Sequence, residues 1–68
     1  MEIYFKDGTV INFDTPLSTE AVHNKIISLR KQGLKYLTLL DNNGNLFKVI
    51  ININEIAYIE KDGIRRDI

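Results

Sequence analysis

Few side chains in this sequence have the types and spacing that catalysis or metal binding requires. His23 is the only histidine, and there is no cysteine. Because a zinc site needs two or three further ligands close by, we interpret His23 as a surface or boundary residue and predict no metal site. Asp7, Asp41 and Asp62 stand next to glycine or asparagine, where aspartate is favoured at turns for backbone reasons. Only a pair of catalytic acids drawn from Glu2, Glu55 and Glu60 stays open. Because no other catalytic pattern is present, we predict that the protein is not an enzyme.

The glycine-containing patterns do not predict a ligand site either. The segment 41–45, Asp-Asn-Asn-Gly-Asn, offers oxygen atoms around a glycine, as calcium loops do. It lacks acidic or amide ligands at alternate positions and a closing glutamate at the twelfth place, so we interpret it as a turn. The four glycines are spread over three turns and a helix end, which leaves no phosphate-binding loop. We predict no cofactor.

Net charge gives the whole chain no preference for a polyanion. Nine Lys and Arg balance nine Asp and Glu, so nothing draws the protein as a whole to nucleic acid or to an anionic membrane. Local basic patches stay open as nucleic-acid contacts, and they comprise Lys25, Arg30, Lys31, Lys35, Arg65 and Arg66. No apolar run approaches the roughly 20 residues of a membrane span, and the N-terminus lacks a leader pattern. We expect a soluble, cytoplasmic protein.

The length predicts one compact domain over residues 1–68, with 62–68 as a frayed tail or a short last strand. A chain below about 70–80 residues has a small core and commonly recruits disulfides, metals or a second copy of itself. Because the 68-residue chain has no cysteine, self-association is the remaining means of extra stabilisation.

The pattern of apolar residues predicts the elements that must position these side chains. Residues 2–6 and 9–13 are strands joined by Asp7-Gly8, a strong signal for a two-residue hairpin turn. Residues 36–41 and 46–53 form a second hairpin if Asn43-Gly44 is its turn, and 56–61 is a fifth strand. We predict an α+β fold, a small antiparallel sheet of four to six strands in the order β-β-α-β-β-β with one amphipathic helix packed on one face.

The helix is the most strongly patterned element. Val22, Ile26 and Leu29 recur at helical spacing and predict a single apolar stripe on a helix of roughly 15 residues. Either Thr15 or Ser18 can cap its start. Gly33 is expected to end it in the left-handed conformation, with the usual hydrophobic contact from the next residue.

Two-residue turns predict a register in which both sheet faces are largely apolar. Tyr4 would then lie opposite Ile11, and Leu37 opposite Ile50. One helix cannot cover two faces, which leaves two explanations. In the first, the sheet curls into a barrel, or a bulge at Gly8 or Gly44 shifts the register. In the second, the other face packs against another chain. We favour the second chain, in a two-fold dimer. The predicted interaction surface comprises Tyr4, Ile11, Phe13, Tyr36, Phe47, Val49 and Ile51.

One segment has a limited family resemblance. Residues 49–60, V-I-I-N-I-N-E-I-A-Y-I-E, resemble the strand–bend–strand pattern at the start of LytTR-type DNA-binding modules, and similar runs occur in small FlbD-like flagellar-associated proteins. The leading hairpin followed by a single helix departs from the LytTR pattern, so we assign the chain to neither family. Asn52 and Asn54 are expected to hold the bend through side-chain hydrogen bonds.

These observations favour binding over catalysis. We expect a small, homodimeric interaction protein that contacts a protein partner through an exposed sheet face or edge, of the kind encoded as accessory or phage-type gene products. Two alternatives stay open. One is a nucleic-acid-binding regulator that uses the basic helix end and Arg65-Arg66. The other is a small-ligand binding protein with its pocket at a subunit interface.

Overall fold

The strands and the helix follow one another in the predicted order, and the tail adds the sixth strand that the prediction left open. The computed structural model describes residues 1–12, 14–40 and 48–68; the side chains of residues 40, 48 and 49 are outside the described part. The elements are β1 (Glu2–Phe5), β2 (Val10–Asn12), α1 (Thr19–Lys31), β3 (Tyr36–Leu40), β4 (Lys48–Asn52), the 3-10 helix η1 (Ile53–Glu55), β5 (Ile56–Lys61) and β6 (Ile64–Asp67). The α+β class and the order β-β-α-β-β-β are therefore confirmed.

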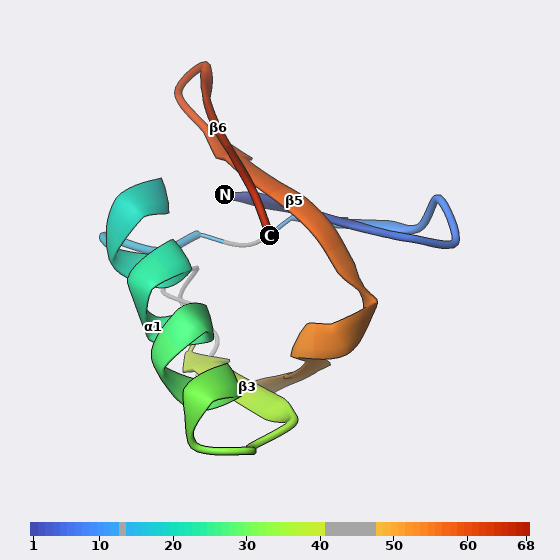
Figure 1. Ribbon diagram of the computed structural model, residues 1–68. Helices are drawn as coiled ribbons and strands as arrows, with labels where there is room; N and C mark the ends of the chain where they lie inside the picture. Colours follow the sequence, from blue (N-terminus) through green and yellow to red (C-terminus); the bar gives the residue numbers. More distant parts are fainter. Residues whose placement is uncertain (13, 41–47) are drawn as a thin grey trace.

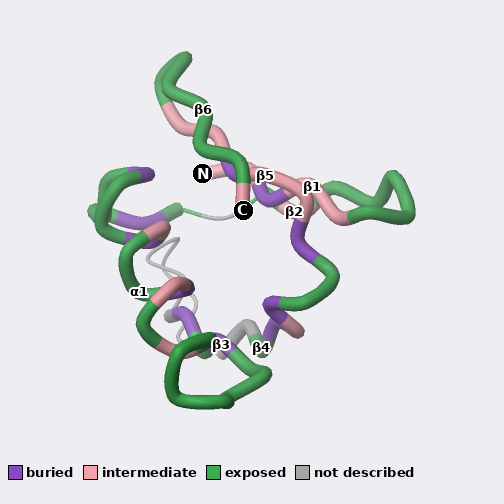
Figure 2. The backbone as a smooth tube through the Cα atoms, in the orientation of Figure 1, coloured by how far each residue is buried: buried purple, intermediate pink, exposed green. Residues whose placement is uncertain are grey.

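The strands form two sheets that share one core with α1. Strands β2, β1, β5 and β6 form a four-stranded antiparallel sheet in that order, and β3 and β4 form a separate two-stranded sheet. Figure 1 shows α1 beside the two sheets, with η1 at the corner where the chain passes from β4 to β5. Buried stretches occur on both sheets and on α1 (Figure 2). The core comprises Ile3, Val22, Ile26, Leu37, Leu39, Ile51, Ile53, Ile56 and Ile59.

Local sequence determines both ends of α1. The Ser18 hydroxyl accepts a hydrogen bond from the Ala21 N–H at 3.1 Å, so Ser18 rather than Thr15 is the N-cap. At the other end Gly33 has φ +74°, and the Leu34 N–H donates to the Leu29 carbonyl at 3.0 Å. This arrangement is a Schellman motif, which needs a left-handed residue after the helix. The predicted helix and its glycine end are confirmed, with 13 helical residues.

The first hairpin contains a bulge that shifts its register. The Gly8 N–H donates to the Phe5 carbonyl at 3.0 Å, and the Phe5 N–H donates to the Thr9 carbonyl at 2.8 Å. Three residues therefore separate the paired positions, with Gly8 at φ +91°, as in a type I turn followed by a left-handed bulge residue. Tyr4 lies opposite Val10, one residue from the predicted partner. The predicted register is wrong, and the bulge at Gly8 is confirmed.

The second hairpin is also shifted by one residue. Leu37 lies opposite Ile51, and Thr38 lies opposite Ile50, so the predicted pairing of Leu37 with Ile50 is wrong. Leu37 and Ile51 are both buried in the core, which the observed register allows because opposite residues share a face. The predicted Asn43-Gly44 turn lies outside the described residues.

The two-residue turn predicted for the first hairpin occurs instead at the last one. Lys61 lies opposite Ile64, and the two residues between them, Asp62 and Gly63, have φ values of +52° and +79°. Two successive positive φ values define a type I′ turn. Residues 64–67 are thus a paired strand, the second of the two alternatives predicted for the tail.

The observed registers give the four-stranded sheet one apolar and one mixed face. Ile3 and Ile59 lie opposite each other and are fully buried in the core, which α1 also enters. The outer face carries mostly charged, amide and aromatic side chains together with one valine, and its residues are Glu2, Tyr4, Val10, Asn12, Tyr58, Glu60, Arg65 and Asp67. The prediction that both faces are largely apolar is wrong for this sheet, because a one-residue shift moves every side chain to the other face.

Candidate interaction surface

A row of stacked side chains covers part of the outer face of the four-stranded sheet. The rings of Tyr4 and Tyr58 stack at 4.3 Å between centroids, with an angle of 15° between their planes. The Arg65 guanidinium lies 3.8 Å from the centroid of the Tyr58 ring and pairs with Asp67 at 2.9 Å. A stacked ring neighbour and a guanidinium both engage the Tyr58 π-surface. We interpret this row as a cross-strand structure that stabilises the sheet.

The Tyr4 hydroxyl is held by an acidic neighbour. It donates a hydrogen bond to Glu2 Oε2 at 2.8 Å. This bond, with smaller contributions from desolvation and from the charges of Glu2 and Glu60, raises the pKa of Tyr4 from 10.0 to about 12. The Tyr4 hydroxyl therefore pairs with a carboxylate two residues away on the same strand, β1. Its proton is bound more tightly than that of an ordinary tyrosine.

The outer face of the β3–β4 sheet has a different composition. We call it the hairpin outer face and define it as Tyr36, Thr38, Ile50 and Asn52, which lie in two adjacent cross-strand pairs. Ile50 is 67% exposed and Tyr36 is 59% exposed. None of these four residues is charged. The register continues to the pair of Leu40 and Lys48, whose side chains are outside the described part. Ile50 is the most exposed large hydrophobic residue of the described part of the chain, so this face leaves apolar surface in contact with solvent.

Residues near the ends of β3 and β4 differ in their roles. Leu34, which follows the helix end, is half exposed. Asn52 holds the bend through its side chain. Its amide oxygen Oδ1 accepts a hydrogen bond from the Asn54 N–H at 3.0 Å and so caps η1. The predicted role of Asn52 in the bend is confirmed. Asn54 takes part through its backbone N–H.

The residues predicted as an interaction surface do not lie on one face. Tyr4 lies on the outer face of the four-stranded sheet, and Ile11 lies on its inner face, packed against the core. Ile51 is buried in the core, whereas Tyr36 is exposed. Phe13, Phe47 and the Val49 side chain lie outside the described part. Of the predicted set, Tyr36 alone belongs to the hairpin outer face.

The predicted basic residues are also dispersed. Arg65 and Arg66 alternate between the two faces of β6; Arg65 covers Tyr58, and Arg66 pairs with Glu20 of α1 at 3.5 Å. Arg30 donates to the Ile53 carbonyl at 3.5 Å, which links α1 to η1. Lys25, Lys31 and Lys35 are exposed. Three of the six residues therefore make contacts within the fold.

The acidic and histidine side chains form no metal cluster in the described part of the chain. His23 is half-buried on α1. Glu2 and Glu60 lie opposite each other on β1 and β5, while Glu55 lies in η1. The segment 41–45, which we interpret as a turn, lies outside the described residues. In the described chain, no helix has the length and apolar character to cross a membrane.

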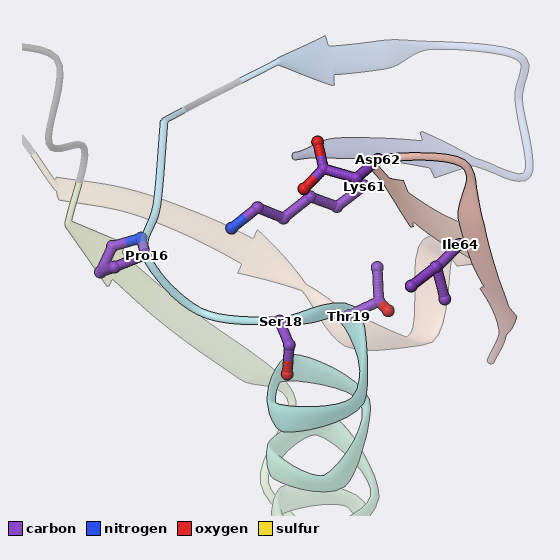
Figure 3. A pocket seen from close by; sticks show the side chains of 6 residues that line it. All are labelled: Pro16, Ser18, Thr19, Lys61, Asp62 and Ile64. Carbon is purple, nitrogen blue, oxygen red and sulfur yellow. The ribbon is translucent and has the colours of Figure 1, made fainter.

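A small pocket lies between the start of α1 and the β5–β6 turn (Figure 3). Its volume is about 140 Å³, below the roughly 300–1,000 Å³ of typical ligand pockets. Figure 3 shows the Lys61 side chain extending toward the loop that precedes α1. The ammonium donates to the Thr15 and Leu17 carbonyls at 2.7 and 2.8 Å. The lining residues are Pro16, Ser18, Thr19, Lys61, Asp62 and Ile64.

Sequence reasoning missed Ile50 as a surface residue. Val49, Ile50 and Ile51 are consecutive apolar residues, so strand alternation gives no sign of which one faces outward. The predicted register placed Ile51 in the surface set and left Ile50 out. Only the correct pairing with β3 distinguishes them.

No known protein family, curated protein or solved structure matches this chain.

Proposed function

We propose that this chain is a non-enzymatic, cytoplasmic interaction protein that associates with a second copy of itself through the hairpin outer face. The observation that carries the proposal is the exposure of Ile50 and Tyr36, at 67% and 59%, within a set of four described residues that carry no charge. Contiguous exposed apolar surface is a feature of interaction sites. The proposal includes a further protein partner that binds the resulting dimer.

The lack of charge among these four described residues favours a second copy as the occupant. A two-fold interface brings the same patch of both copies together, so any charge near the axis meets a like charge. Tyr36, Thr38, Ile50 and Asn52 avoid this repulsion. The outer face of the four-stranded sheet is less suitable, because Glu2 and Glu60 lie side by side there and would repel their copies across the axis.

The size of the surface predicts a weak dimer. Full burial of a large apolar side chain contributes about 1.5–3 kcal/mol, and Ile50 and Tyr36 are already partly covered. Stable dimers bury roughly 800 Å² on each partner, more than two such side chains supply. We therefore expect a dissociation constant on the order of 100 µM, which corresponds to about −5.5 kcal/mol.

Replacement of Ile50 by lysine tests this surface. Ile50→Lys places two like charges in the proposed interface, and its high exposure leaves the fold of the single chain unaffected. Sedimentation velocity from low micromolar to millimolar concentration should show a concentration-dependent dimer for the unmodified protein and a monomer for the variant.

The matched control is Val10→Lys, which adds the same charge at an exposed β-branched residue of the other sheet. This variant should dimerise as the unmodified chain does. A strict monomer at millimolar concentration, or a dimer that Ile50→Lys leaves intact, would overturn the proposal. Far-UV circular dichroism of both variants checks that the fold is retained.

A further inference from the structure

We draw no further inference here: the strongest candidate, the small pocket between the first turn of α1 and the β5–β6 turn, carries nothing because it joins a helix N-terminus to a lysine ammonium already bound to two carbonyl oxygens, and nothing in the described part of the structure points to a ligand there.

Discussion

At the residue scale, Tyr4 shows how one side chain depends on its neighbours. Its hydroxyl donates to Glu2, and its ring stacks on Tyr58. Because the folded protein holds the Tyr4 proton with a pKa of about 12, against 10.0 for an ordinary tyrosine, folding is linked to protonation. This contribution to stability is complete below pH 10 and is lost as the pH rises from 10 towards 12.

An alkaline titration followed by tyrosinate absorbance tests this coupling. Of the three tyrosines, Tyr4 should ionise at about pH 12. Glu2→Gln removes the negative charge and should bring this step towards pH 10, while Tyr4→Phe should eliminate it. An unchanged titration curve in Glu2→Gln would show that the carboxylate does not control Tyr4.

Lys61 is the second residue whose role depends on contacts distant in sequence. Its ammonium binds the Thr15 and Leu17 carbonyls and so fixes the loop before α1 to the end of β5. Hydrogen bonds from charged groups contribute about 1.5–3 kcal/mol. Because Lys61 is half-buried, we expect Lys61→Met to lower the free energy of unfolding by about 1–2 kcal/mol, as measured by urea denaturation.

Lys25→Met is the matched control for Lys61→Met. Lys25 is exposed on α1, and methionine and lysine have similar helix propensities. The control should therefore unfold at nearly the urea concentration of the unmodified chain. Equal midpoints for the two variants would mean that the Lys61 hydrogen bonds contribute nothing measurable.

At the element scale, the tripeptide Lys-Asp-Gly forms two different turns. In residues 6–8 it ends in a bulge, with Asp7 Oδ1 accepting from the Thr9 N–H at 2.9 Å. Hydrogen bonds from Thr9 also lower the pKa of Asp7 below its usual value. In residues 61–63 the same tripeptide forms a type I′ turn. Turn residues therefore predict the position of a hairpin, whereas the strands around them select its geometry.

The type I′ turn favours a glycine at its second position, because the backbone there has a positive φ. Gly63 has φ +79°, and a Cβ there would meet no other atom within 4 Å. The cost of Gly63→Ala is therefore that of the left-handed backbone alone, about 1–2 kcal/mol. Denaturant melts should show this loss, whereas Asp62→Asn, which suits a positive φ, should change stability by less than about 0.5 kcal/mol. Unaltered stability of Gly63→Ala would contradict the turn assignment.

At the scale of the whole molecule, stability depends on one small core. A 68-residue chain has a free energy of unfolding of about 3–10 kcal/mol at typical values per residue. Ile59 is fully buried between the four-stranded sheet and α1. Truncation of such a residue costs about 2–5 kcal/mol. Ile59→Ala should therefore remove much of the free energy of unfolding.

The register can be tested by comparing Ile59→Ala with Ile50→Ala at low protein concentration. Ile50 is largely exposed in the single chain, so its truncation should change stability by less than about 0.5 kcal/mol. Circular dichroism during urea unfolding measures both. A loss at Ile50 as large as that at Ile59 would place Ile50 in the core and would contradict the observed pairing of β3 with β4.

The sequence alone determined several features that depend on neighbouring residues. The helix stripe and the Gly33 end are local, because each involves residues within one or two turns of α1. The sequence offered both Thr15 and Ser18 as the N-cap, and the structure selects Ser18. The order of strands and the α+β class follow from the same periodic patterns. The candidate site was harder to predict from the sequence. Of the hairpin outer face, only Tyr36 was predicted to lie at a surface.

Only the tertiary structure decided which side chains face the core. In β4 the apolar residues follow one another without alternation, so the sequence is compatible with either register. In the first hairpin, Asp7-Gly8 fits both a two-residue turn and a bulged one. Packing against α1 selects the registers that bury Ile3 and Ile51, because a shift of one residue would exchange them for side chains of the opposite face. The exposure of Ile50 is a consequence of that selection.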